Sequence, residues 1–174
     1  MSTVAAKWLF LFTIASLFFL TGCKKDNVDP INPPTPTVTE PLAITANITA
    51  KTTLIDRVAN PELPDYIVTK SIDVNNELTI NPGVVVAFER DVRMNVNDNG
   101  GLLIAKGEAA KKIRFIGLEK TKGFWMGIAL YSGSNANTME YVEVMHAGSR
   151  PIYSTTKSAL FMSGGSRAQI GLKN

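Results

Sequence analysis

Polar side chains of the types that bind ligands or metals gather in one short segment of this sequence. The segment NVNDNGG, residues 95–101, contains Asn95, Asn97, Asp98 and Asn99 before two glycines. Oxygen-rich clusters can hold calcium, but Asn, Asp and Gly are also the residues that tolerate tight turns. One carboxylate offers little charge to a divalent cation. We therefore expect a turn, keep Asn97, Asp98 and Asn99 as weak metal candidates, and expect no cofactor.

Two groups of charged residues could serve acid–base chemistry, which on a polysaccharide needs a set of carboxylates and a nearby base. They are the segment FERDVR, residues 88–93, and the pair Glu140 and Glu143. Alternating charges in the first group more simply describe a solvated turn. Residues three apart face opposite sides of a strand, which argues against a paired centre at Glu140 and Glu143. The single histidine, His146, has no partners that spacing can supply, so we expect no catalytic residue.

Three aromatic residues lie close together in the second half of the chain: Phe124, Trp125 and Tyr131. Aromatic rings can stack on sugars, and these three are the candidates for glycan contact. Rings also fill gaps in a hydrophobic core and cap turns. Both interpretations remain open from the sequence.

The elements that must position these residues are short strands. From Thr52 onward, β-prone pieces alternate with glycine-containing turns, and no apolar stripe of helical period persists. The segments ELTINPG (77–83) and GLLIAKG (101–107) match at a shift of 24 residues. This match places Leu78 on Leu102 and Ile80 on Ile104, with a glycine at the end of each segment.

Further copies of the same pattern follow along the chain. GIALYSG (127–133) matches GLLIAKG at a shift of 26 residues, which places Ile128 on Leu102. The following pairs also align: Val86 and Phe88 with Ile113 and Phe115, and then with Met139 and Tyr141. In a weaker fourth copy, Leu160 and Met162 fall on Ile128 and Leu130, and Ile170 and Leu172 fall on Met139 and Tyr141. A period in the mid-twenties with paired apolar residues indicates a solenoid. Stacked copies would place Leu78, Leu102 and Ile128 in an internal ladder, with Ile104 inside and Thr79 outside.

This pattern, and LTINPGVVVAF (78–88) in particular, resembles the right-handed parallel β-helix proteins. The resemblance implies an all-β fold of about four coils over residues 51–174. It says little about function, since the fold hosts lyases, hydrolases, adhesins and binding proteins. An antiparallel sandwich would also show short strands, but it would not predict the positional matches. The last copy ends without a polar capping segment, so we expect a truncated member of a longer family or self-association through an open C-terminal rung.

The first residues have the pattern of an export signal. Lys7 is followed by a nearly wholly apolar run over residues 8–20, which suits a signal peptide and is short for a membrane-spanning helix. Residues 20–23, LTGC, resemble a bacterial lipobox, which implies that residues 1–22 are removed and that Cys23 is lipidated. Several acyl chains on one residue anchor a protein stably. We expect Cys23 to hold the protein to the membrane.

A tether separates this anchor from the β-helix. Residues 24–41 contain five prolines and few aliphatic residues, so they favour an extended, semi-rigid chain; we assign residues 23–50 to the lipidated N-terminus and linker. The residues CKKD resemble the start of Bacteroidetes-type lipoproteins, in which such residues mark transport to the cell surface. We expect an outer-membrane lipoprotein of the cell envelope, with the choice between periplasmic and surface-facing display left open.

The composition of the chain limits the classes of partner that it is expected to bind. The formal charge of the 174-residue chain is +3, and no cluster of Lys and Arg suggests nucleic acid. One cysteine excludes an internal disulfide. We expect a non-enzymatic envelope protein that presents a β-helix to a polysaccharide or to another envelope protein. The alternative is a polysaccharide lyase or hydrolase, or the N-terminal fragment of one.

Overall fold

The computed structural model describes residues 40–174, and within this range the chain forms short strands and turns without any helix. The predictions for the leader and for Cys23 concern residues outside the described range. The first strand, β1, begins at Leu42. Ordered β-structure therefore starts inside the segment 23–50 that the sequence assigned to the linker.

The strands form three sheets. The first sheet consists of β1 (Leu42–Ile44), β3 (Tyr66–Val68), β6 (Val85–Phe88), β9 (Ile113–Gly117) and β12 (Val142–Val144). The second sheet consists of β4 (Ile72–Val74), β7 (Arg93–Val96), β10 (Gly127–Leu130) and β13 (Leu160–Met162). The third sheet consists of β2 (Thr52–Leu54), β5 (Glu77–Ile80), β8 (Leu102–Lys106), β11 (Thr138–Glu140) and β14 (Gly171–Lys173).

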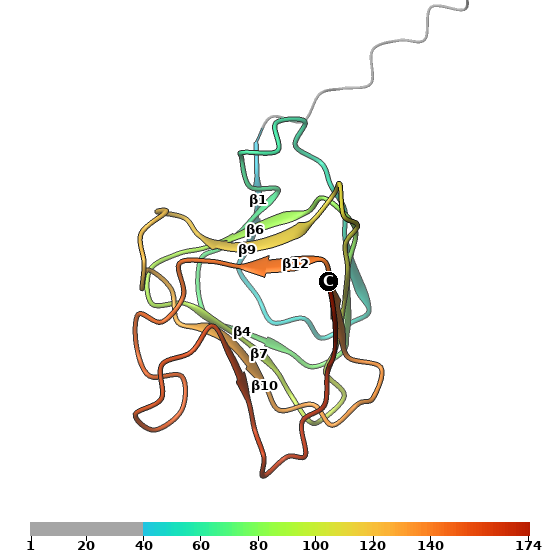
Figure 1. Ribbon diagram of the computed structural model, residues 1–174, viewed down its shortest axis with the longest axis vertical. Coiled ribbons are helices and arrows are strands. Elements are labelled where there is room, and N and C mark those ends of the chain that lie inside the picture. The colour runs from blue at the N-terminus through green and yellow to red at the C-terminus, as the bar shows by residue number, and fades with distance from the viewer. Residues whose placement is uncertain (1–39) are drawn as a thin grey trace, which may run out of the picture. The chain divides into compact units, whose positions relative to one another are not determined.

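Successive turns of the chain pass through the first, second and third sheets in that order. Figure 1 looks along the stack, with β6, β9 and β12 along one side and β4, β7 and β10 along another. Every pair of neighbouring strands in these sheets is parallel. The predicted right-handed parallel β-helix is confirmed, and an antiparallel sandwich is excluded.

The core runs along the axis of this stack because parallel pairing places equivalent side chains one above another. In the second sheet, Ile72 lies beside Met94, Met94 beside Ile128, and Ile128 beside Leu160. The first three of these are buried. Residues that alternate with them face away from this core. In the first sheet, Val85, Ala87 and Ile116 on that outer side form a second, smaller buried cluster.

The register predicted for the third sheet is wrong by one residue. Leu78 pairs with Leu103, and Ile80 pairs with Ala105. Leu103 and Ala105 are fully buried, whereas Leu102 and Ile104 point outward and are partly exposed. Three consecutive apolar residues allow either set to face the core, and a slip of one residue exchanges the two faces. Thr79 faces outward, as predicted.

The third predicted copy belongs to a different sheet, because each rung contains three strands and the sequence pattern accounted for only two. Ile128 stacks on Met94 in the second sheet and not on the third sheet. The fourth copy is confirmed where Leu160 pairs with Ile128. Its last strand is shifted, because Leu172 and not Ile170 pairs with Met139.

The alignments predicted for the first sheet are also wrong, in two ways. One is shifted by two residues, and the other joins residues that belong to different strands. Val86 pairs with Phe115 where Ile113 was expected, a shift of two residues that keeps the same face inward. Ile113 pairs with Val142 and not with Met139. Tyr141 takes a φ of 49° at the bend that separates β11 from β12, so Met139 and Tyr141 do not form one strand.

Candidate ligand-binding face

The outer face of the second sheet carries a column of hydrogen-bonded polar side chains. Asp73 alternates with the buried Ile72 and Val74, so its side chain points outward. The Asn95 side chain donates from Nδ2 to Asp73 Oδ1 at 2.8 Å. Asn47, in the preceding turn of the chain, accepts a hydrogen bond from the Asp73 backbone N–H at 3.0 Å. These contacts order three polar side chains in neighbouring rungs.

A second column runs beside the first, at the carboxyl ends of the same strands. Asn97 Nδ2 donates to Asn75 Oδ1 at 2.7 Å. In the next rung the equivalent position is Tyr131, whose backbone N–H donates to Val96 O at 2.8 Å. This column therefore passes from amides to an aromatic ring along the stack.

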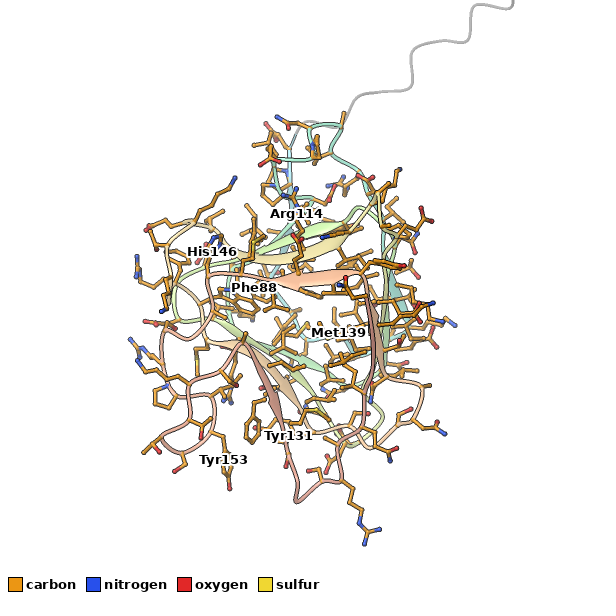
Figure 2. The ribbon with its side chains drawn as sticks, viewed as in Figure 1. Phe88, Arg114, Tyr131, Met139, His146 and Tyr153 are labelled. Carbon is orange, nitrogen blue, oxygen red and sulfur yellow. The ribbon has the colours of Figure 1, made fainter. Side chains whose placement is uncertain are left out.

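Three partly exposed aromatic residues gather on the last rungs of this face. Phe161, in β13, lies beside Ala129 in the outward-facing column. The rings of Tyr153 and Phe161 stack with their centroids 5.1 Å apart, and Tyr131 meets Phe161 edge-on at 6.2 Å. The Tyr153 residue is 59% exposed. Tyr131 and Tyr153 lie on the side of the second sheet, opposite Arg114 and the first sheet (Figure 2).

The loop that presents Tyr153 is held in place by polar contacts. Arg93 Nη1 donates to the carbonyl of Ile152 at 3.3 Å, and the Ile152 side chain is buried. Arg150 forms an ion pair with Asp91 at 2.7 Å. The Tyr153 ring thus extends from a loop anchored on both the strand and the neighbouring turn, which limits the entropy lost when a ligand binds.

A hollow of about 430 Å³ adjoins these columns at the corner between the second and third sheets. It is lined by Asp98, Gly100, Gly101, Leu102, Ser132, Gly133, Ser134 and Ser166. We call the set Asp73, Asn75, Asn97, Tyr131, Tyr153 and Phe161 the amide–aromatic face. The hollow lies next to this face, beyond Tyr131.

Phe124 and Trp125, two of the predicted glycan-contact residues, lie in the core. The Trp125 ring is fully buried and stacks on Phe88 at 4.0 Å, and its Nε1 donates to Met145 O at 2.7 Å. Phe124 is also buried, with the Arg90 guanidinium 4.5 Å from the centre of its ring. Rings covered in this way cannot stack on a sugar. Tyr131 is the predicted residue that reaches the surface.

The predicted metal candidates separate in the structure. Asn97 belongs to the hydrogen-bonded column, while Asp98 and Asn99 form an exposed turn before β8. Among residues 40–174, no group of three or more His, Cys, Asp or Glu side chains could hold a metal ion. The same range contains no helix long and apolar enough to cross a membrane.

The charged residues considered for acid–base chemistry form ion pairs on the surface. Glu143 pairs with Lys112 at 2.8 Å, Glu140 with Lys173 at 3.9 Å, and Arg90 with Glu119 at 3.1 Å. Glu140 and Glu143 lie on strands of different sheets. His146 accepts a hydrogen bond on Nδ1 from the backbone of Gly117 at 3.3 Å, which is a structural role at the turn after β12.

A larger groove, of about 540 Å³, lies over the first sheet. Its charged side chains neutralise one another: Lys111 lies 3.8 Å from Asp56, and Arg114 lies 3.7 Å from Glu62. Arg114 also donates to the backbone carbonyl of Pro61. These contacts hold the loop after β2 on the sheet, so the groove has few groups left to select a ligand.

Four residues of the amide–aromatic face escaped the sequence analysis: Asp73, Asn75, Tyr153 and Phe161. Phe161 lies in the segment of the fourth copy, between the inward Leu160 and Met162, so its outward direction follows from that alignment. Tyr153 lies in a loop, and no periodic pattern predicts its stacking on Phe161. Comparisons with protein-family models, with curated proteins and with solved structures found no match to this chain.

Proposed function

We propose that this protein is a lipid-anchored protein of the cell envelope that binds a neutral polysaccharide through the amide–aromatic face. The observation that carries the proposal is the arrangement of Tyr131, Tyr153 and Phe161 on the same sheet face as hydrogen-bonded columns of Asn and Asp. Catalysis is not part of the proposal.

The chemistry of the face matches that of a sugar. Side-chain amides both donate and accept hydrogen bonds, so they can bind a sugar hydroxyl group whether it acts as donor or as acceptor. Aromatic faces can cover the apolar C–H surface of a pyranose ring. Asp73 is the one carboxylate among the six residues and already accepts from Asn95 and Asn47. A ligand of many hydroxyl groups and little charge suits this set better than an anionic one.

The repeat of the fold favours a polymer over a single sugar. Neighbouring parallel strands lie about 4.8 Å apart, so equivalent side chains recur at that interval along the stack. The outward column of the second sheet runs from the partly exposed Asp73 in β4 to the partly exposed Phe161 in β13, with the buried Asn95 and Ala129 between them. A polysaccharide chain lying along the axis of the stack would meet amides at one end and aromatic rings at the other.

Membrane attachment rests on the sequence around Cys23. The apolar run at residues 8–20 and the LTGC segment support lipidation, and the proline-rich residues 24–41 would hold the β-helix away from the bilayer. A binding domain held in this way would capture polysaccharide near the membrane.

Binding can be tested with Tyr153→Ala. A whole aromatic side chain buries roughly 150–250 Å², so contact with about a third of it buries some 50–80 Å². At about 25 cal/mol per Å² this is roughly 1–2 kcal/mol, or about a tenfold change in Kd. We expect affinity electrophoresis through gels containing β-glucan, xylan, mannan or starch to retard the wild type and to retard Tyr153→Ala much less.

The control is Leu63→Ala, which removes another exposed apolar side chain (44% exposed) from the loop between β2 and β3. This variant should keep wild-type mobility in each gel. The proposal would be refuted if the wild type bound no neutral polysaccharide, or if the wild type and Tyr153→Ala bound equally well.

Anchoring is tested separately with Cys23→Ala. We expect this variant to be released from membranes by a carbonate wash that leaves the wild type in the pellet, because acyl chains on Cys23 are the proposed attachment. Equal retention of the two proteins would overturn the lipoprotein assignment without affecting the binding test.

A further inference from the structure

The chain between β12 and β13 forms a loop outside the stacked strands (Figure 1), and one buried side chain holds it on the second sheet. Of residues 150–157, only Ile152 is buried, at 2% exposure. Ile152 belongs to neither of the two clusters of buried hydrophobic side chains. Its carbonyl accepts the hydrogen bond from Arg93, an outward residue of β7. The Ile152 side chain therefore packs on the outside of the sheet and not in the axial core.

The loop is closed on itself by its own polar contacts. The Ile152 N–H donates to Thr156 O and the Thr156 N–H donates to Tyr153 O, both at 2.8 Å. Lys157 Nζ donates to the carbonyl of Ser149 at 3.0 Å, which ties the two ends of the loop together. The loop can therefore keep its shape if it moves as a whole.

Backbone contacts show where such a movement would begin and end. The Ser149 N–H donates to Trp125 O, and the Ile128 N–H donates to Ala159 O, both at 2.9 Å. Between these two fixed points, the backbone-to-backbone hydrogen bonds of residues 150–157 are internal to the loop. Movement of this segment would therefore break no strand pairing.

The contacts that join the loop to its surroundings lie at the surface. The ion pair of Arg150 with Asp91, 2.7 Å long, has side chains that are 67% and 29% exposed. Exposed pairs of this kind contribute little to stability. The Tyr153 residue is 59% exposed where its ring stacks on Phe161. Loss of these contacts would leave the three sheets and the axial core intact.

Buried polar atoms without a hydrogen-bond partner lie at the base of the loop. In the part of the chain that the structure describes, three such side-chain atoms occur: Asn95 Oδ1, Ser149 Oγ and Ser158 Oγ. Ser149 and Ser158 flank the loop in sequence, and Asn95 is the next outward residue after Arg93. A buried polar atom without a partner is destabilising. Water would reach these atoms if the loop lifted from the sheet, so their burial opposes the closed state.

We propose that residues 150–157 form a flap that opens without unfolding of the β-helix, and that only the closed flap holds Tyr153 against Phe161 for ligand contact. The second half of this inference rests on the proposed polysaccharide binding, and the first half does not. In the open state the two rings separate, and the aromatic part of the amide–aromatic face is lost. The buried Ile152 side chain, which is not part of that face, keeps the flap closed. A ligand that contacts both rings would shift the population toward the closed state.

Thiol labelling of the full-length chain tests the opening, with Cys23→Ala removing the one native cysteine. Ser158→Cys places a thiol at the base of the flap and nearly keeps the shape of a side chain whose hydroxyl has no partner. Val96→Cys, at a fully buried core position of β7, is the control. Without denaturant we expect Ser158→Cys to react at least about 100-fold faster than Val96→Cys, because local opening requires less free energy than global unfolding. Low concentrations of urea should change the Ser158→Cys rate little, since opening exposes little surface.

Removing the buried contact of the flap should speed this labelling and leave the core unchanged. Ile152→Asp should raise the labelling rate of Ser158→Cys at least about tenfold, because a charged side chain is not buried without a partner. Ile152→Val is the matched control, since it keeps an apolar side chain and should label at nearly the wild-type rate. Labelling of Val96→Cys should stay slow with either change, which shows that the β-helix remains folded.

The polysaccharide gels test the second half of the inference, with Ile152→Asp in the otherwise unchanged chain. The Ile152 side chain is buried in the closed flap, so it cannot itself touch a ligand there. We expect Ile152→Asp to raise the Kd about tenfold, as Tyr153→Ala does, because the open flap no longer presents the Tyr153 ring. Ile152→Val should keep wild-type mobility.

Three results would count against the inference, each against a different part. Equal labelling rates of Ser158→Cys and Val96→Cys would show that the loop opens only when the whole domain unfolds. Wild-type binding by Ile152→Asp, with labelling of Ser158→Cys accelerated, would show that the closed flap is not required for binding. A wild type that binds none of the polysaccharides would overturn the proposed function and the role of the closed flap in it, while the labelling rates would still decide whether the flap opens.

Discussion

Paired substitutions at Leu103 and Ile104 test the register of the third sheet. Leu103 points into the core and has no exposed surface, while its neighbour Ile104 points outward between Thr79 and Thr138. The two residues are adjacent and of equal carbon number. We expect Leu103→Ala to lower the free energy of unfolding much more than Ile104→Ala does.

The expected magnitudes follow from burial. Truncating a fully buried Leu to Ala costs about 2–5 kcal/mol, because the removed carbons are lost from the core and part of the cavity remains. The hydrogen bond from the Leu103 backbone N–H to Asn137 Oδ1, 2.8 Å long, is retained in the variant. Ile104 is partly exposed, so its truncation removes only a fraction of a side chain's burial energy, about 1 kcal/mol or less.

Thermal unfolding followed by circular dichroism can separate the two variants. For a domain of this size, 1 kcal/mol corresponds to roughly 3–5 °C in Tm, so Leu103→Ala should lower Tm by about 10 °C or more. Ile104→Ala should lower it by less than about 5 °C by the same scaling. A larger loss for Ile104→Ala would restore the register in which Leu102 and Ile104 face the core.

Two further predictions concern polar contacts. Asp65 is buried and accepts three backbone hydrogen bonds, from Arg57, Val58 and Val85 at 2.7–2.8 Å; Asp65→Ala leaves these donors without their acceptor and should cost about 3 kcal/mol or more in urea unfolding. The hydrogen bond from Lys51 lowers the pKa of Glu77 below its ordinary 4.5. A carboxyl group whose pKa is lower in the folded state stabilises the fold at a pH above its unfolded-state pKa. This contribution is lost as the pH falls through the folded-state pKa. Any Tm advantage of the wild type over Glu77→Gln at pH 7 should therefore shrink below pH 4.5, and an advantage that grows on acidification would contradict this.

The parallel stack was predictable from the spacing of apolar residues along the sequence. Repeated apolar pairs at intervals in the mid-twenties can be explained by stacking, and the fourth copy gave the pairing of Leu160 with Ile128 correctly. The residue-level register was not predictable where apolar residues are consecutive. In Leu102, Leu103 and Ile104, hydrophobicity does not distinguish the two faces, and the observed choice places the small Ala105 inside.

Strands β4 and β7 of the second sheet escaped prediction because their outward residues are polar. Asn95 alternates with the buried Met94 and Val96, and Asn97 follows them. In the sequence these amides join Asp98 and Asn99 to form what reads as one long turn. The structure ends the strand at Val96 and begins the turn beyond it. Of these amides, Asn97 belongs to the proposed binding face, where it donates a hydrogen bond to Asn75.

The geometry of the β-helix relates the two parts of the proposed binding face. The outward column from Asp73 through the buried Asn95 and Ala129 reaches Phe161 in β13. Asn47 precedes Asp73 in that column, so polar side chains occupy its first rungs and an aromatic ring follows in β13. A polymer bound along that axis would meet both kinds of contact within one molecule, and its attachment at one part of the face would raise its effective concentration at the other.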